Sequence, residues 1–222
     1  MIRTDDIIDR TFRAVSRSGV WVALALLVAI SGCRQADGEQ QADTSPPASD
    51  SAPPSVIMKP EDADRFWVFA DSKDELGAGG EFHVYVDPVT YPDALASFAK
   101  FALGAGGALP VHRHDKTEEI AYFLAGQGAA TVYMDGNPQD IAVGAGSVLY
   151  TPPGSWHAIT NTGEQPLALV FAAIPNEKKG LLSFFRRIGI KPGEEPAALS
   201  PEEFARVAAE HDLILRPPET EQ

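Results

Sequence analysis

The sequence predicts an all-β barrel or sandwich that is followed by two C-terminal α-helices. Short apolar runs recur along the chain, and several alternate apolar with polar positions, as strands with one buried face do. Glycine and proline separate these runs at the spacing that is typical of antiparallel barrels and sandwiches. The pattern becomes helical only near the C-terminus. At 222 residues the chain is long enough for one such domain or for two small ones.

Seven segments carry the strand pattern. The longest, 95–103, is favoured as a strand over a helix because a glycine-rich stretch ends it at 104–107. After the fifth segment, Asp135 and Gly136 form a pair that is typical of tight hairpin turns. The expected strands are 66–69, 81–86, 95–103, 119–124, 129–134, 147–151 and 167–173.

The last helix has a clear start signal. Ser200 is placed to cap it, Pro201 stands at the first helical position, and Glu203 completes a capping box. These residues predict a helix over 201–211.

An earlier helix is expected at 181–188, where Phe184 and Phe185 precede two arginines. We expect the aromatic side chains to pack on the barrel and Arg186 and Arg187 to lie in solvent. The alternative is that this helix forms a lid over the barrel mouth.

The start of the chain has the organisation of an export signal. Four arginines within residues 3–17 precede an apolar run, 20–30, that is too short to span about 30 Å of hydrocarbon as a helix. The run ends in Ile30-Ser31-Gly32-Cys33, which resembles the lipobox of bacterial lipoproteins. The resemblance implies a lipoprotein signal peptide at 1–32 and lipidation of Cys33. A chance apolar stretch or a short anchor helix is the alternative.

Residues 33–56 are expected to form a disordered tether. Between 35 and 55 the chain has no aromatic or large aliphatic residue, so it cannot bury enough apolar surface to fold. A single domain with its C-terminal helices would then occupy 57–217. Bacterial lipoproteins with Asp after the lipidated cysteine favour the inner membrane, and here that position is Arg34. The resemblance therefore implies a lipid-anchored protein of the cell envelope, in the outer membrane and facing the periplasm.

Charge and cysteine content exclude several functions. With 31 acidic and 18 basic residues the formal net charge is −13, which argues against nucleic acid as a partner. The same charge disfavours docking onto anionic lipids, so membrane attachment would come from the lipid anchor. One cysteine allows neither an intrachain disulfide nor a cysteine-based zinc cluster.

The histidines carry the chemistry. His112 and His114 are two residues apart, so on a strand they face the same side, and Glu119 follows soon after. His157 comes much later, after a Pro-Pro-Gly turn. Three imidazoles and a carboxylate could converge on one divalent metal and leave coordination positions open for a ligand.

The two blocks around these residues resemble the two motifs of the cupin superfamily, with every spacing kept. The first block supplies Gly106, His112, His114, Glu119 and Gly126, and the second supplies Gly146, Pro152, Gly154, His157 and Asn161. The resemblance implies an all-β cupin fold, a double-stranded β-helix or jelly-roll barrel.

By the same resemblance, the metal ligands are His112, His114, Glu119 and His157, and Glu119 is also the candidate catalytic base. Glu118 satisfies a looser form of the first motif, but only Glu119 keeps the spacing to Gly126. The cofactor would be a divalent transition metal, namely Fe, Mn, Ni, Co, Cu or Zn. A degenerate cupin without a metal is the alternative.

Four further residues have simpler interpretations. His83 is expected to be a sheet histidine, and His211 to lie near the end of the last helix. Phe123 is expected in the barrel interior, either as packing or as a pocket wall. Asn161 is expected to be structural, with its amide bonded across the 152–154 turn.

The chain from about 66 to 213, including the tail at 181–213, resembles single-domain bacterial cupins described as quercetin-dioxygenase-like, although the tail does not set the substrate. This resemblance implies a metal-dependent dioxygenase that acts on a small molecule. The alternative is a non-enzymatic module of the cell envelope that binds or senses a metal or a small ligand. Isomerisation or decarboxylation of a small acid or sugar is a third class. The resemblance also leaves open a homodimer formed through sheet edges.

Overall fold

The computed structural model describes residues 54–69, 76–195 and 199–217. The predicted signal peptide, Cys33 and the tether up to residue 53 lie outside the described residues. No helix within the described ranges is both long enough and apolar enough to cross a membrane.

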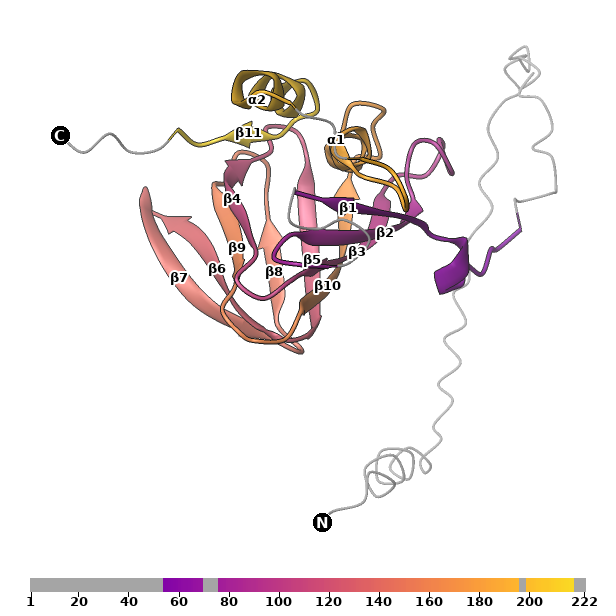
Figure 1. The fold of residues 1–222 in the computed structure, drawn as a ribbon. Coiled ribbons are helices and arrows are strands. Elements are labelled where there is room, and N and C mark those ends of the chain that lie inside the picture. Colours follow the sequence, from indigo (N-terminus) through magenta and orange to yellow (C-terminus); the bar gives the residue numbers. More distant parts are fainter. Residues whose placement is uncertain (1–53, 70–75, 196–198, 218–222) are drawn as a thin grey trace, which may run out of the picture. The chain divides into compact units, whose positions relative to one another are not determined.

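Two antiparallel sheets face each other, as Figure 1 shows. One sheet has the strand order β1-β2-β3-β10-β5-β8, and the other has the order β11-β4-β9-β6-β7. The strands are β1 Asp64–Val68, β2 Gly80–Val86, β3 Ser97–Leu103, β4 Ala108–Arg113, β5 Glu118–Ala125, β6 Gln127–Met134, β7 Asn137–Gly144, β8 Val148–Thr151, β9 His157–Asn161, β10 Leu167–Ile174 and β11 Ile214–Leu215. The fold is thus an all-β jelly roll with C-terminal helices, as the sequence predicts.

The core fills the space between the sheets. Phe82, Phe101, Phe123 and Leu169 project inward from neighbouring strands of the larger sheet and are almost fully buried. Ile159 meets them from β9 of the smaller sheet. The alternation on each strand follows from the two-residue period of side-chain direction, so the sequence pattern correctly identified which side faces the core.

All seven predicted strands are present, and the structure adds four. The hairpin at Asp135 and Gly136 is confirmed, since both residues have positive φ, 51° and 81°, as a primed turn requires. It leads into β7, which the sequence did not predict because its first six residues are all exposed and it contains Pro138. Strands β4, β9 and β11 were likewise not predicted as strands from composition.

The helix α1 (Leu181–Ile188) packs as predicted through Phe184 and Phe185, which are buried. The expectation that both arginines lie in solvent was wrong for Arg186. Its guanidinium forms ion pairs with Asp64 of β1 and with Asp87, whose side chain is 1% exposed. These two carboxylates hold the helix to the first strands of the barrel.

The helix α2 (Pro201–Glu210) begins with the predicted capping box. The Ser200 hydroxyl accepts a hydrogen bond from the Glu203 N–H, and the Glu203 carboxylate accepts one from the Ser200 N–H. After the helix, β11 pairs antiparallel with β4, so that Leu215 lies opposite His112. The C-terminal segment therefore reaches a strand that carries a candidate ligand.

Candidate metal centre

Three buried histidines meet inside the barrel. His112 lies near the end of β4, His114 follows directly after that strand, and His157 begins β9. The pairing of β4 with β9 sets His112 opposite His157, and their ring centroids are 4.2 Å apart. One ring nitrogen from each of the three side chains lies within 4.8 Å of the others. The structure thus brings together three residues that are distant in the sequence.

Backbone carbonyls fix the tautomer of each histidine. The Nδ1 atoms of His112, His114 and His157 lie 2.7, 2.7 and 3.1 Å from the carbonyl oxygens of Pro110, Asp212 and Ser155, respectively. A carbonyl oxygen only accepts hydrogen bonds, so each Nδ1 must carry the proton and donate. Each Nε2 therefore keeps its lone pair, which is the form that coordinates a metal.

Burial also keeps these side chains neutral. Desolvation lowers the pKa of His157 to about 4, lowers that of His112 well below its usual value, and lowers that of His114. For His112 and His157, the charge of a neighbouring histidine adds to the effect. All three are thus neutral ligands at pH 7.

Glu119 is the carboxylate beside this cluster. Its Oε2 lies 3.7 Å from Nε2 of His114, and its side chain is 10% exposed. Glu118, its neighbour on β5, has the opposite side-chain direction and is only partly buried. Burial raises the pKa of Glu119 to about 7, so the carboxyl titrates near neutrality unless a cation stabilises its charged form.

The residues fit a divalent transition metal. His114 Nε2 is fully buried and has no hydrogen-bond partner, which is costly unless another group uses its lone pair. Three neutral imidazoles and one carboxylate are a donor set that suits Fe, Mn, Co, Ni, Cu or Zn. The site therefore has the ligand chemistry of a mononuclear metal centre, and the set does not distinguish among these metals.

Several pockets adjoin the cluster, and two of them differ clearly in their lining. A closed pocket of about 20 Å³ is lined by His112, Glu119 and His157 on one side and by apolar side chains, including Leu181 and Phe185 of α1, on the other. This volume is enough for about one water molecule. A second, more open pocket of about 280 Å³ reaches His157 from between β6 and β8. Small ligands thus have room on the second side.

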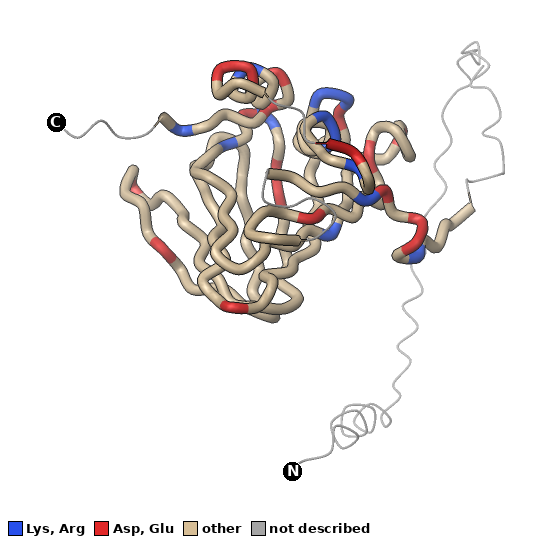
Figure 2. Tube along the Cα trace, viewed as in Figure 1, with Lys and Arg blue, Asp and Glu red and all other residues tan. Residues whose placement is uncertain are grey.

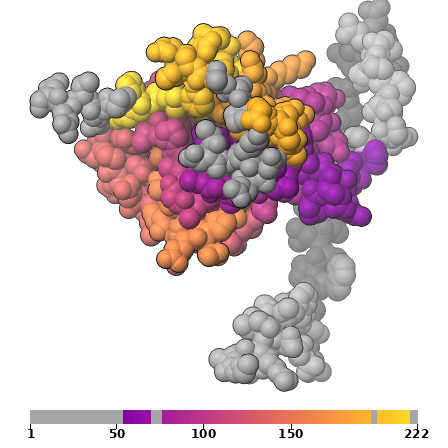
Figure 3. All heavy atoms as spheres, in the orientation of Figure 1, coloured from indigo at the N-terminus to yellow at the C-terminus, as the bar shows by residue number. Residues whose placement is uncertain are grey.

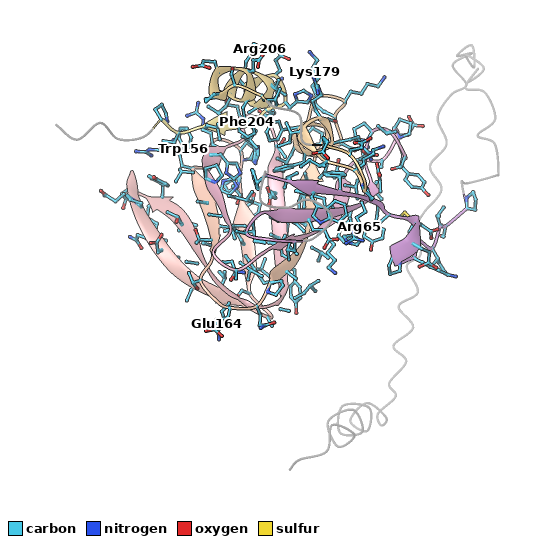
Figure 4. The ribbon with its side chains drawn as sticks, viewed as in Figure 1. Arg65, Trp156, Glu164, Lys179, Phe204 and Arg206 are labelled. Atoms are coloured by element: carbon cyan, nitrogen blue, oxygen red, sulfur yellow. The ribbon has the colours of Figure 1, made fainter. Side chains whose placement is uncertain are left out.

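The open pocket has an aromatic wall. Trp156 lines it, and the guanidinium of Arg113 lies 4.8 Å above the Trp156 ring. Arg216 lies over the Tyr133 ring at 4.5 Å, and Tyr133 lines the same pocket. In Figure 4, Trp156 lies toward the end of the barrel that carries the helices, while Glu164 lies at the opposite end.

The turn at Gly154 and the side-chain amide of Asn161 hold the segments around the histidine cluster in place. Gly154 has φ 83° and its N–H donates to the His114 carbonyl at 2.6 Å, which ties the turn before His157 to the other ligand strand. Asn161 is structural, as predicted, but its partners differ from the prediction. Its side-chain amide donates to the carbonyls of Leu103, Gly104 and Gln165, and not across the 152–154 turn.

Asp212 was not identified from the sequence. Its carbonyl accepts the hydrogen bond from His114, and its carboxylate accepts from three backbone N–H groups and one hydroxyl in residues 115–117. Asp212 has φ 61°, which places it in the left-handed region that Asp tolerates better than most residues. Figure 3 shows these yellow C-terminal elements packed on the barrel. No local pattern signals a contact across 98 residues.

The remaining candidates lie away from the cluster. His83 faces outward on β2, beside Glu81 at 3.3 Å, which agrees with a sheet histidine. His211 caps α2, where its Nδ1 lies 2.8 Å from the Val207 carbonyl. Phe123 is fully buried in the core and lines neither of these two pockets, so the packing interpretation holds.

Comparison with known proteins identifies a cupin domain within the chain. The model of the cupin domain family matches residues 99–173, which include both motifs. An oxalate-binding protein of Thermotoga maritima is 36% identical over 77 residues, which are 35% of this chain and 60% of that protein. A germin-like protein of Oryza sativa subsp. japonica is 33% identical over 90 residues, 39% of each chain. The chain thus spans about 60% of the first of these relatives and less of the second.

Two solved structures resemble part of this chain. A predicted oxalate decarboxylase from Thermotoga maritima has a TM-score of 0.45 and 23% identity, over 54% of this chain and 99% of that one. An oxalate oxidase has a TM-score of 0.41 and 21% identity, over 45% of this chain and 52% of that one. The match to the cupin domain model spans both motifs and lies on the two-sheet barrel with the histidine cluster inside, so residues 99–173 form a cupin domain.

Proposed function

We propose that His112, His114, His157 and Glu119 hold one divalent transition metal, and that the centre acts on a small molecule. The observation that carries the proposal is the convergence of three Nε2 lone pairs, each fixed by a hydrogen bond at Nδ1. His114 Nε2 is buried without a hydrogen-bond partner, and a bound cation would give this nitrogen one.

The metal would supply a Lewis acid that binds an oxygen donor of the substrate. The chain's own residues supply the rest. The imidazoles fix the position of the cation, and the apolar side chains around the closed pocket exclude bulk water. Glu119 stands between that pocket and His114, where it could take a proton from a bound ligand as the catalytic base.

The substrate class is a small oxygen-donor molecule. A pocket of about 280 Å³ that reaches His157 leaves room for one compact ligand. Two curated relatives carry oxalate in their names, an oxalate-binding protein and a probable oxalate decarboxylase. A small carboxylate is therefore the first ligand to test.

A quercetinase-like dioxygenase is the second candidate. The aromatic wall at Trp156 and Tyr133 favours a flat aromatic substrate, since rings of this kind stack on one another. Oxygen uptake with a flavonol would distinguish this activity from carboxylate chemistry. Ligand binding without turnover of either substrate would support the non-enzymatic binding module instead.

The first experiment measures metal content. The natively purified protein should contain about one transition-metal ion per chain, and His157→Ala should lose it. His83→Ala, a histidine on the outer side of β2, is the matched control and should keep the metal. Unchanged metal content in His157→Ala would refute the proposed centre. The metal found is then used for tests of oxygen uptake and of CO₂ release from oxalate.

We also propose that the chain is a lipoprotein of the cell envelope, anchored at Cys33 in the outer membrane. The apolar run that ends at Cys33 and the polar segment after it support this location. Mass spectrometry of the protein from bacterial membranes should find a diacylglyceryl group on Cys33 and no residues 1–32. Cys33→Ser should release the protein from the membrane fraction.

A further inference from the structure

Two buried polar side chains, Glu119 and Thr151, have no hydrogen-bond partner within the part of the chain that the structure describes. Thr151 is 3% exposed, and Glu119 lies 3.7 Å from His114 Nε2, which is too long for a hydrogen bond. A buried polar group without a protein partner is expected to meet a water, an ion or a ligand. The other buried polar or charged residues each form at least one side-chain hydrogen bond, and they are Asp87, Ser97, His112, His114, Thr117, His157 and Asn161.

Glu119 and Thr151 are direct cross-strand partners. The pairing of β5 with β8 sets Glu119 opposite Thr151, and both side chains point into the barrel, as the alternation of buried positions on each strand shows. The Cβ atoms of such partners lie about 5 Å apart. Their neighbours on the same inner surface, Ala173, Ala121 and Leu149, are apolar. The two unpartnered groups therefore form one polar spot on an apolar wall.

The Thr151 side chain faces the open pocket. It lines this space of about 280 Å³ together with His157, so a ligand that enters there and reaches the metal would pass beside the hydroxyl. Threonine is β-branched, and few rotamers are open to it on a strand. The hydroxyl is therefore held in place before a ligand arrives, which lowers the entropy cost of binding.

The lining of the open pocket contains no lysine, arginine, aspartate or glutamate among the described residues. Figure 2 shows most of the strand segments in tan, with red and blue gathered mainly on the helices and loops. An anionic ligand in this pocket would thus have its charge met by the metal and its remaining oxygens by neutral donors. Of the hydroxyl groups that line the pocket, only that of Thr151 belongs to a buried residue, since Ser155 and Tyr133 are partly exposed and Tyr150 is exposed.

We propose that Thr151 is a specificity-determining residue of the metal centre, which donates a hydrogen bond to a carboxylate oxygen of the bound ligand. The inference rests on the proposed function. A small carboxylate has more than one oxygen, so one can bind the cation while another accepts from the Thr151 hydroxyl. Glu119, opposite Thr151, then stays free to take a proton from the ligand. The site would favour such ligands over those with a single oxygen donor, because these would leave the buried hydroxyl unpaired.

The test removes the hydroxyl and keeps the branched shape of the side chain. Thr151→Val in the full chain, loaded with the metal found in the wild type, should bind oxalate about 10-fold more weakly in isothermal titration calorimetry. Thr151→Ser keeps the donor and should stay within about 3-fold of the wild type. Thr131→Val is the matched control, because that hydroxyl lies on the outer side of β6 and donates to Asp140. Its oxalate affinity should equal that of the wild type.

Two further readouts separate a ligand contact from a structural role. Metal content should be equal in all four proteins. The melting temperature of ligand-free Thr151→Val should not fall, because the substitution removes no hydrogen bond within the protein. A lower melting temperature with unchanged oxalate affinity would make Thr151 structural and overturn the inference. Weaker metal binding with unchanged oxalate affinity of the loaded variant would make Thr151 a partner of Glu119 and overturn it as well.

The fate of the metal centre is measured separately. Equal oxalate affinity in Thr151→Val and the wild type, or a metal-loaded wild type that binds no oxalate, would overturn the inference about Thr151 and leave the centre intact. A wild type that holds no transition metal would refute the proposed centre and this inference together.

Discussion

At the level of single residues, the proposed metal centre depends on which of two adjacent carboxylates, Glu118 or Glu119, faces the barrel interior. Glu119→Gln removes the anionic donor while it keeps the size of the side chain, so transition-metal affinity should fall at least about 10-fold. Glu118→Gln, on the opposite side of β5, should leave the affinity unchanged. Titration with a competing chelator measures both. Equal losses in the two variants would show that Glu119 is not a ligand.

The convergence of the three histidines was predictable for a physical reason. A site built from two short blocks needs fixed spacings, because His112 and His114 must share a face and Gly154 must turn the chain toward His157. Spacing of this kind is visible in a sequence. The Nδ1 partners are not, since Pro110, Ser155 and Asp212 contribute only carbonyl oxygens, which every residue has.

At the level of elements, α1 depends on one buried carboxylate. Burial alone would raise the pKa of Asp87, but hydrogen bonds from Thr90 and the Arg186 guanidinium outweigh it, and the net pKa is lowered. A carboxyl whose pKa is lower in the folded state stabilises the fold above its unfolded pKa of about 3.9. That contribution is lost as the pH falls through the lower, folded value.

Asp87→Asn should therefore destabilise the protein by about 2 kcal/mol at pH 7 and have less effect as the pH falls below about 4. Denaturant unfolding of the variant and the wild type, between pH 7 and pH 2, measures this difference in the free energy of unfolding. The difference from the wild type isolates Asp87, because the buried histidines titrate in both proteins. Asp93→Asn, in the exposed part of the same loop, is the control. A penalty that stays constant down to pH 2 would contradict the assignment.

The C-terminal segment is a second element that the site requires. Asp212→Gly keeps the left-handed backbone and the carbonyl that orients His114, but removes the carboxylate that bonds residues 115–117. We expect about a 10-fold loss of metal affinity, because that carbonyl is then held less rigidly. Asp135→Gly replaces another Asp of positive φ, in an exposed hairpin, and should have no effect on the metal. Equal affinity in both variants would limit Asp212 to a structural role.

The features that the sequence analysis missed were missed for a common reason. β7 is a polar, exposed hairpin arm, and β11 has two residues, so neither has an apolar period to detect. Arg186 was assigned to solvent because its partners, Asp64 and Asp87, come from segments about 100 residues earlier. Local patterns report which face of an element is buried, but they do not report which polar groups meet there.

At the scale of the whole molecule, the metal should bind to the folded chain and not to the unfolded one. Four strands, β5 to β8, separate His114 from His157 in the sequence, so only the folded barrel brings their nitrogens together. A ligand that binds only the folded state stabilises it by about 2.7 kcal/mol at 100 times its Kd. For a domain of this size the melting temperature should rise by about 5–10 °C.

Scanning calorimetry of the metal-free and metal-loaded protein measures this shift. Mg²⁺ at the same concentration should give none, because it prefers oxygen ligands to imidazole. His157→Ala should fold, since its loss leaves a space beside an already open pocket, but its melting temperature should not respond to the transition metal. If the transition metal raises the melting temperature of His157→Ala as much as that of the wild type, the cation binds outside the barrel. The three buried histidines would then need another explanation.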